Sequence, residues 1–539
     1  MTRLLSLCKF PVAALVVSMA CTTSMAARSD ADPPGAQTRT HDQDGRDGGL
    51  HAALHASRIG YEQAAAKIST RAAQPSRARG RRAKNVILFI GDGMGVSTVT
   101  AARILEGQNK GGHGEENSLS FDVFDHAALI KTYSIDQQTA DSAPTATAIV
   151  TGYKVNGYAI SVGPEVPRRE GDYAKIEPYV LETLLERAEA RGLSTGIVST
   201  ARVTHATPAA LYAHTPNRDW ERAGQLPAGA TVLDIAAQLI ERQKMGNGIE
   251  VVLGGGREMF LPTTRADPEY PQHAGQRTDS RDLIAEWVAA QPQSAYVRNK
   301  ADFDALDTRK VSRLLGLFEP SHMRFEADRA DDAAGEPSLA DMTRKAIELL
   351  SRNRKGFYLM VEAGRIDHAH HAGNAYRALT DTIALSDAVR VAMQATDPRD
   401  TLILVTADHS HTMTIAGYPR RGNPILGLAR APAEKDFSRD HLGHPYTTIG
   451  YANGRGYASL EVGGETRYGF PIAAGRVKDL SSVDTTDEGF HQEALVGLIA
   501  ETHGGEDVPL YAHGAGSSLV GGTMEQNEIY HVMRAALGL

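Results

Sequence analysis

The stretch Asn85-Val86-Ile87-Leu88-Phe89-Ile90-Gly91-Asp92-Gly93-Met94-Gly95 indicates the fold of the chain. Its first part, residues 85–90, is a nearly continuous apolar run of strand length, as expected for a strand buried on both faces of a parallel sheet. A glycine-rich turn with one acidic residue, Asp92, follows directly. Because ligands of α/β sheets bind at the carboxyl ends of strands, Asp92 is well placed for a functional role. The alternative is a turn aspartate held between glycines.

The same order of apolar strand, turn and helix recurs along the chain. Further strands are predicted at 195–199, 249–253, 357–361 and 401–405. Helices are predicted at 97–106, 179–190, 338–350 and 375–396. This alternation predicts an α/β fold, with a large, mostly parallel sheet between helices on both faces. Residues 418–487 are rich in Gly and Pro and contain only short β-like runs, so they are predicted to form a small β or irregular insertion.

The N-terminus has the features of an export signal. Arg3 and Lys9 are positive, the apolar run at 10–20 is too short to span a bilayer, and 24–26 has the small-x-small pattern of a cleavage site. We expect cleavage after this pattern and a periplasmic or secreted protein without a transmembrane anchor. Lipid attachment at Cys21 is the less favoured alternative.

The remaining chain divides into a tail and a globular domain. Residues 27–83 are predicted to be disordered or weakly ordered, with a weak helix around 60–71, and the domain extends over 84–539. A net charge of −8 argues against nucleic acid as a partner. Cys8 and Cys21 both lie in the signal, so the cleaved chain has no cysteine and must rely on its core or on metals for stability.

Acidic residues and histidines gather after the predicted strands. Residues 362–371 contain two carboxylates, Glu362 and Asp367, and three histidines. Residues 408–411 read Asp-His-Ser-His, and residues 503–507 read His-Gly-Gly-Glu-Asp. Carboxylates mixed with imidazoles suit zinc, and oxygen ligands alone suit magnesium. One such cluster could be surface decoration, but several at strand ends predict a multinuclear metal site. Paired metals suit in-line displacement at phosphorus.

Ser142 lies in the segment 139–148, which is predicted to turn into a helix. Pro144 suits the first turn of that helix and Gly152 suits its C-cap. A serine hydroxyl there lies at the positive end of a helix dipole, a favourable place for an anion. The alternative is that Ser142 is only an N-cap.

Five motifs resemble, in order, those of alkaline phosphatases. They are residues 91–95, 141–143, 362–371, 406–411 and 503–507. The resemblance runs from about Asn85 to the C-terminus. It implies that family's three-layer α/β sandwich, hydrolysis of small phosphate monoesters at alkaline pH, and two zinc ions and one magnesium ion per chain.

The resemblance also implies a role for individual residues. Ser142 is implied as the nucleophile that becomes a phosphoserine, and Arg218 as the clamp on two phosphate oxygens, for which a planar charged fork is suited. The ligands implied for the zinc that holds the leaving oxygen and later the attacking water are Asp367, His371 and His503. Those implied for the zinc that activates Ser142 are Asp92, Asp408 and His409. Those implied for magnesium are Asp92, Thr207 and Glu362. His411 is implied to orient a zinc ligand.

Finer matches point to the animal members of the family. His205 and His368 match histidines of those enzymes, which implies a strongly alkaline optimum and lets zinc compete with magnesium. Four positions resemble the calcium site of the animal enzymes: Glu269, the Phe318 carbonyl, Glu319 and Glu336. Glu336 stands where the animal enzymes have an aspartate, and the loop before it differs in length by one residue. Residues 418–487 resemble the crown subdomain at the animal dimer interface, which implies a homodimer.

Two other functions compete with this interpretation. A phosphodiesterase or sulfatase of the same superfamily would need room for a second ester substituent where Arg218 is expected, so Arg218 favours monoesters. A catalytically inactive metal- or phosphate-binding protein would tolerate the loss of Ser142, and this chain retains both Ser142 and the ligands.

Overall fold

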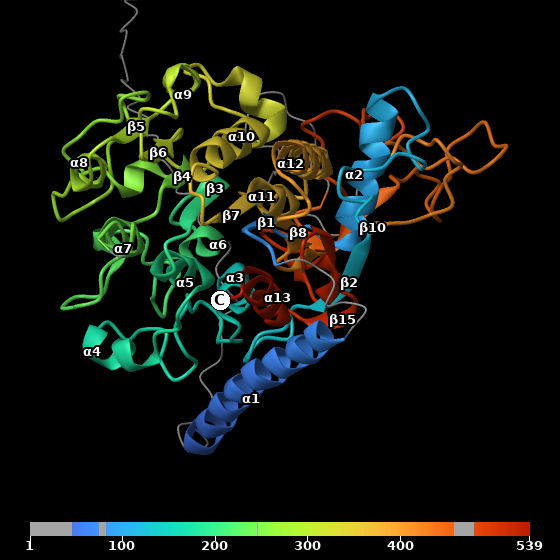
Figure 1. Ribbon diagram of the computed structural model, residues 1–539. Helices are drawn as coiled ribbons and strands as arrows, with labels where there is room; N and C mark the ends of the chain where they lie inside the picture. Colours follow the sequence, from blue (N-terminus) through green and yellow to red (C-terminus); the bar gives the residue numbers. More distant parts are fainter. Residues whose placement is uncertain (1–45, 75–81, 245, 457–478) are drawn as a thin grey trace, which may run out of the picture. The chain divides into compact units, whose positions relative to one another are not determined.

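A ten-stranded sheet organises the computed structural model of the chain (Figure 1). The structure describes residues 46–74, 82–244, 246–456 and 479–539. Within them β14 runs against both of its neighbours, and the other strands of the sheet share one direction. In sheet order the strands are β15 (Gly522–Glu525), β2 (His126–Lys131), β14 (Val508–Gly514), β8 (Thr401–Ala407), β1 (Asn85–Gly91), β7 (Phe357–Ala363), β3 (Ser194–Arg202), β4 (Val251–Gly255), β6 (Arg313–Leu317) and β5 (Ser294–Val297).

The predicted first strand lies in the interior of the sheet. β1 pairs in parallel with β7 and β8, and all of its residues are buried, in keeping with their apolar character. The register places Ile90 beside Glu362, and Gly91 beside Ala407. Asp92, Glu362 and Asp408 therefore reach the same edge of the sheet, and the predicted parallel α/β architecture is confirmed.

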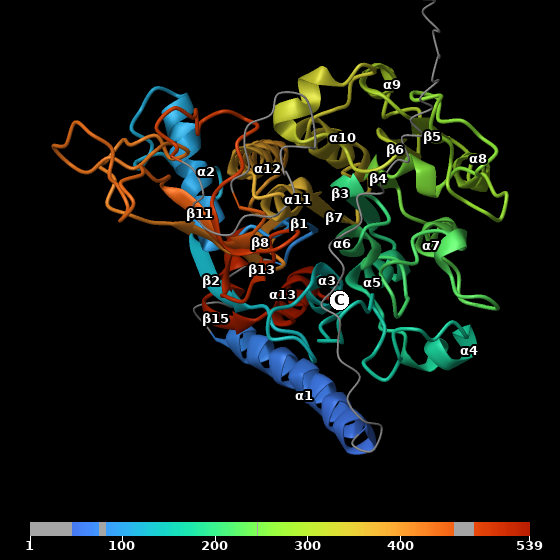
Figure 2. The ribbon, with the colours of Figure 1, turned by 180° about the vertical axis from the view of Figure 1, so that it is seen from behind.

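Helices cover both faces of the sheet (Figures 1 and 2). One layer contains α2 (Val96–Asn109), α10 (Leu339–Leu350) and α12 (Ala375–Ala395). The other contains α3 (Ser142–Thr151), α5 (Leu184–Ala190) and α13 (Glu528–Leu537). Further helices are α4 (Tyr173–Ile176), α6 (Ala206–Ala209), α7 (Ile235–Arg242), α8 (Leu283–Ala290), α9 (Lys300–Ala305) and α11 (Arg365–His371).

The helix expected at 179–190 begins later than predicted. Thr183 caps α5, because its hydroxyl accepts the backbone N–H of Glu186 while the Glu186 carboxylate accepts that of Thr183. This capping box fixes the start of the helix at Leu184. The start predicted from Ser338 is confirmed, since a capping box with Asp341 opens α10.

Part of the predicted tail is an ordered helix. α1 (Arg46–Ala73) includes the helix expected around 60–71, begins earlier than predicted and lies along α13 (Figure 1). Tyr61 stacks on Tyr153 with ring centroids 4.2 Å apart, and Lys67 pairs with Glu528 at 2.7 Å. Tertiary contacts therefore supply the order that the local sequence did not indicate. Among the described residues no helix is long and apolar enough to cross a membrane.

The insertion at 418–487 contains the strand β11 (Ile449–Gly454) and is mostly irregular elsewhere in its described part. β11 joins β10 (Met413–Ile415) and β12 (Ala494–Gly497), which flank the insertion in the chain, in a three-stranded sheet. A two-stranded sheet joins β9 (Ser410–His411) and β13 (His503–Gly504). No helix occurs in the described portions 418–456 and 479–487. The β-like run predicted at 457–462 lies outside the described residues.

Candidate active site

The turn after β1 brings two strand ends together. The backbone N–H groups of Gly93 and His409 each donate to Asp408 Oδ1 at 3.0 Å. Gly93 has φ 69°, and a side chain there would collide with the His411 ring. The glycine is therefore required both by its backbone conformation and by the close approach of His411. The two bonds fix the Asp408 carboxylate and leave Oδ2 facing the site.

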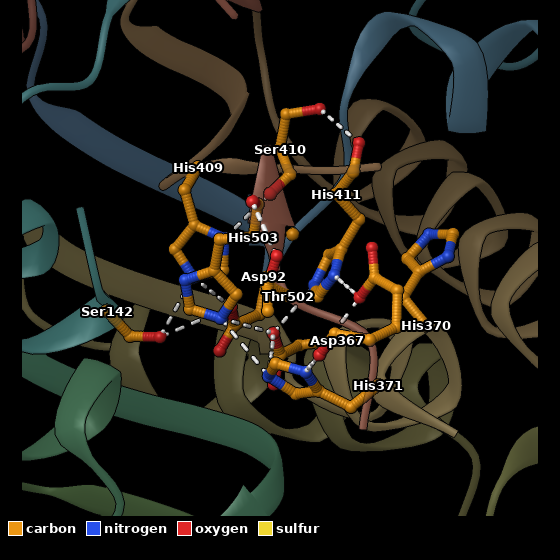
Figure 3. Close-up of polar contacts among 12 residues, drawn as sticks. Asp92, Ser142, Asp367, His370, His371, His409, Ser410, His411, Thr502 and His503 are labelled. Carbon is orange, nitrogen blue, oxygen red and sulfur yellow. Dashed lines mark hydrogen bonds and ion pairs between the residues drawn. The ribbon is translucent and has the colours of Figure 1, made fainter. Parts of the chain in front are cut away.

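Asp367, His371 and His503 form the first ligand group (Figure 3). His371 Nδ1 donates to the carbonyl of Glu501 at 2.6 Å, and His503 Nδ1 donates to that of Ala140 at 2.9 Å. Because these nitrogens carry the protons, both Nε2 atoms present lone pairs. Those Nε2 atoms are 3.1 Å apart and lie 3.4 and 3.3 Å from Asp367 Oδ1. A cation between them would satisfy all three, so the donor set fits zinc.

Asp92 and His409 lie beside Ser142 in Figure 3 and form the second group together with Asp408. His409 Nε2 lies 3.3 Å from both Asp92 Oδ1 and Asp408 Oδ2. Ser142 Oγ lies 3.1 Å from the same Nε2 and 3.5 Å from Asp92 Oδ1. Burial lowers the pKa of His409 to about 3, so the ring is neutral and can act as a ligand.

A third group is made of oxygens deeper in the site. Asp92 Oδ2, Thr207 Oγ1 and Glu362 Oε1 are buried without a hydrogen-bond partner among the described residues. Burial and the nearby carboxylates raise the pKa of Asp92 well above its usual value, and burial raises that of Glu362 to about 7. Buried oxygens without donors are costly, and a hard cation would remove that cost. The residues therefore fit magnesium, while His205 in the same group would suit zinc.

Arg218 lies beside the start of α3. Its Nη1 donates to Asp141 Oδ1 at 2.6 Å, and its Nη2 lies 2.7 Å from His205 Nε2. Asp141 occupies the N-cap position of α3, but neither it nor Ser142 caps the helix through its side chain. The alternative that Ser142 is only an N-cap is therefore wrong, whereas the predicted C-cap at Gly152 is confirmed.

Residues around the ligands hold them in place. His411 Nε2 contacts Asp367 Oδ1 at 2.7 Å, and His411 Nδ1 contacts Glu501 Oε2 at 2.6 Å. Burial opposes the charged form of His411, but the carboxylates of Glu501 and Asp367 raise its pKa to about 10. His368 lies farther out, with its ring centroid 5.4 Å from that of His205.

Sequence reasoning missed two residues of this surrounding layer. Glu501 is fully buried and also accepts the backbone N–H of Thr412 at 2.6 Å. His322 packs against His368 with ring centroids 4.2 Å apart. Glu501 could have been found as an acid two residues before a histidine ligand. No local signal distinguishes His322.

The residues predicted to bind calcium form an acidic cluster away from Ser142. Glu269, Glu319 and Asp332 have oxygens within 4.8 Å of one another, and Glu336 is adjacent with Oε2 buried and without a partner among the described residues. Burial and the carboxylates of Glu319 and Asp332 raise the pKa of Glu336 to about 9. Asp332 was missed by the sequence analysis. Phe318 is buried next to Glu319 in the chain. This oxygen-only set fits a hard cation.

Comparison with known proteins identifies the family. A family model described as alkaline phosphatase matches residues 83–539. The chain belongs to the alkaline phosphatase family. The tissue-nonspecific alkaline phosphatase of Gallus gallus is 45% identical over 463 residues, covering 84% of each chain. The alkaline phosphatase of Gadus morhua is 42% identical, covering 84% of this chain and 92% of that one. The chain is thus an enzyme that hydrolyses phosphate monoesters, and its predicted likeness to animal members is confirmed.

Solved alkaline phosphatases share the fold. The Thermus thermophilus enzyme superposes with a TM-score of 0.61 and 24% identity, covering 85% of this chain and 92% of that one. The enzyme from the Antarctic bacterium TAB5 gives 0.56 and 22%, covering 85% and 99%. The predicted three-layer sandwich of this family is therefore confirmed.

Proposed function

We propose that this alkaline phosphatase works at alkaline pH through a phosphoserine on Ser142, with two zinc ions and one magnesium ion bound by the three ligand groups. The observation that carries the proposal is the position of Ser142 Oγ, 3.1 Å from His409 Nε2 at the edge of the second group. A nucleophile needs a neighbouring group or ion that favours its alkoxide form, and this position supplies one.

The chain's own residues bind and orient the ester. Ser142 Oγ attacks phosphorus in line, the bond to the departing alcohol breaks, and water then releases phosphate from the serine. Arg218, with its guanidinium fixed by Asp141, presents N–H groups to two phosphate oxygens. Bound zinc would supply Lewis-acid stabilisation of the attacking and departing oxygens. Since phosphoryl transfer makes little covalent demand on the protein, positioning and charge neutralisation carry most of the rate.

The position of Arg218 supports monoesters over diesters. Its guanidinium is largely buried and held between Asp141 and His205 beside the nucleophile. A second ester substituent would replace an oxygen that Arg218 binds. An inactive binding protein is disfavoured, because the hydroxyl of Ser142 is retained among the ligands.

Further parts of the proposal rest on the sequence. The N-terminal segment supports export to the periplasm or secretion, and the insertion at 418–487 supports a homodimer. The acidic cluster supports one calcium ion, with Asp332 beside the predicted Glu269, Glu319 and Glu336.

The proposed mechanism is tested with Ser142→Ala, and Ser517→Ala is the matched control. Ser517 is a buried serine in a short helix (Ser517–Leu519) near the amino end of β8, opposite the ligand groups. We expect kcat/KM for an aryl phosphate at alkaline pH to fall at least about a thousandfold in Ser142→Ala, because the nucleophile is lost. Acid-quenched wild-type enzyme should carry phosphate on the peptide that contains Ser142, as measured by mass spectrometry.

Retention of more than a tenth of the activity by Ser142→Ala would refute the phosphoserine route. Phosphate found on another residue of the quenched wild type would refute it as well. Zinc content should be the same in wild type and both variants.

A further inference from the structure

His370 has no place among the proposed ligands, yet it is fully buried beside them. Its Nδ1 lies 2.7 Å from the hydroxyl of Tyr451, and its Nε2 lies 3.0 Å from Thr98 Oγ1. Both ring nitrogens are thus occupied by side chains, one from β11 and the other from α2. The ring can turn only if both hydrogen bonds break.

The helix that carries His370 also carries two proposed zinc ligands. α11 spans only Arg365–His371, and no side chain caps its N-terminus at Gly364. So short a helix has little stability of its own and takes its orientation from tertiary contacts. His370 directly precedes His371 and lies three residues after Asp367, so fixing its ring also fixes this turn of the helix.

A second route from His370 to the ligands runs through ring packing. The rings of His370 and His411 stack with centroids 4.7 Å apart and an interplanar angle of 30° (Figure 3). His411 in turn contacts Asp367 Oδ1 at 2.7 Å. A change in the plane of the His370 ring would therefore displace the side chain that orients Asp367.

We propose that His370 is a positioning residue, held by Tyr451 and Thr98, which orients Asp367 and His371 toward zinc and couples that ion to β11. The inference rests on the proposed zinc site. By linkage, zinc bound there stabilises the attachment of β11 to the same degree that this attachment retains zinc. The insertion, which contains β11, is thereby connected to the metal through a specific set of side chains.

The simpler interpretation is that His370 is a buried histidine whose hydrogen bonds are merely satisfied. In that case its partners contribute to the stability of the fold but leave the zinc unaffected. The rate of zinc release distinguishes the two interpretations, because a purely structural contact changes unfolding without changing the escape of the ion from the folded enzyme.

The test measures zinc transfer from the fully loaded enzyme to a chromophoric chelator. The phase belonging to the first ligand group is the one that His371→Ala removes. We expect Tyr451→Phe and His370→Phe to accelerate this phase about threefold to tenfold, less than the 10–100-fold effect of groups that bond a ligand directly. Combining the two substitutions should give no more than His370→Phe alone, since both remove the same hydrogen bond.

Tyr358→Phe is the control, because Tyr358 is a fully buried tyrosine whose hydroxyl has no partner among the described residues. Its zinc release should equal that of the wild type. Wild-type release rates in both Tyr451→Phe and His370→Phe would overturn the positioning role while leaving the zinc site intact. A wild-type enzyme without the phase that His371→Ala removes would overturn the zinc site and this inference together.

Discussion

The ligand groups around Ser142 and the acidic cluster both bury carboxylates, but they satisfy them differently. Around Ser142, carboxylates alternate with histidines whose Nε2 lone pairs converge on the same points. In the acidic cluster, arginines already meet part of the charge: Arg257 donates to Glu269 at 2.8 Å and Arg324 to Glu319 at 3.1 Å. The ligand groups around Ser142 therefore need cations to balance their lone pairs and charges, whereas arginines of the protein already neutralise part of the acidic cluster.

This difference predicts different costs when the ion is removed. Without cations, the groups around Ser142 would retain lone pairs that face one another and buried oxygens without partners. They would also lose the Lewis-acid catalysis that the metals supply. The acidic cluster would protonate instead, because burial raises the pKa of Glu269 to about 7 and that of Glu336 to about 9. We therefore expect removal of the ions around Ser142 to abolish activity, and removal of an ion from the acidic cluster to change stability with little effect on activity.

Within this comparison of the two regions, the largest effect is expected from Asp92→Asn. Asp92 belongs to two ligand groups, so its loss should weaken both. We expect kcat/KM for an aryl phosphate to fall by roughly a thousandfold, which corresponds to about 4 kcal/mol of lost charge stabilisation. Asp332→Asn removes the same charge from the acidic cluster and should change kcat/KM less than about twofold. Equal losses in the two variants would break the contrast between the two regions.

A smaller effect is expected from calcium. Calcium at 100 times its Kd should stabilise the fold by about 2.7 kcal/mol and raise the melting temperature by about 3 °C. Asp332→Asn should lose most of this increase, because its carboxylate lies within the cluster. The neighbouring Asp331 is exposed, so Asp331→Asn should respond to calcium as the wild type does. A full calcium response in Asp332→Asn would exclude Asp332 as a ligand.

The smallest effect is a pH dependence of stability. It comes from a buried carboxyl group whose hydrogen-bond partners are neutral. Burial, followed by the charge of Glu250, raises the pKa of Glu189 from 4.5 to about 8. Between these values the folded chain keeps a proton that the unfolded chain releases, so the stability from this group falls as pH rises from about 4.5 to about 8. Glu189→Gln does not ionise, and its melting temperature relative to wild type should rise by about 2 °C between pH 6 and pH 9.

Glu177→Gln serves as the control for this measurement, because Glu177 is exposed. Its difference from wild type should stay constant across the same range. A constant difference for Glu189→Gln as well would show that Glu189 is ionised throughout.

The sheet and many of the metal-binding acids at its edge were predictable, because short local stretches of sequence indicate them. Apolar runs such as 85–90 identify interior strands, and the acids that end them must meet at one edge of a parallel sheet. The ligand set itself came from the family resemblance. The placement of Arg218 could not be derived locally, since its contact Asp141 lies 77 residues away.

Three features escaped the sequence analysis for tertiary reasons. Asp332 reaches the acidic cluster through the path of its loop, whereas the family resemblance pointed to Glu336, which precedes Pro-Ser-Leu. Glu501 looks like a surface acid until the fold places it against His411. Over residues 54–73, whose side chains are described, α1 buries few large groups, and the contacts of Tyr61 and Lys67 that order it are with distant parts of the chain.

The docking of α1 has a consequence for the order of events during synthesis. Lys67 bonds to Glu528 across 461 positions of the chain, and Arg71 bonds to the carbonyl of Gly521 across 450. α1 therefore emerges from the ribosome long before the residues that it docks against. The helix must wait undocked until α13 and the turn before it have been made, so its attachment follows the folding of the sheet.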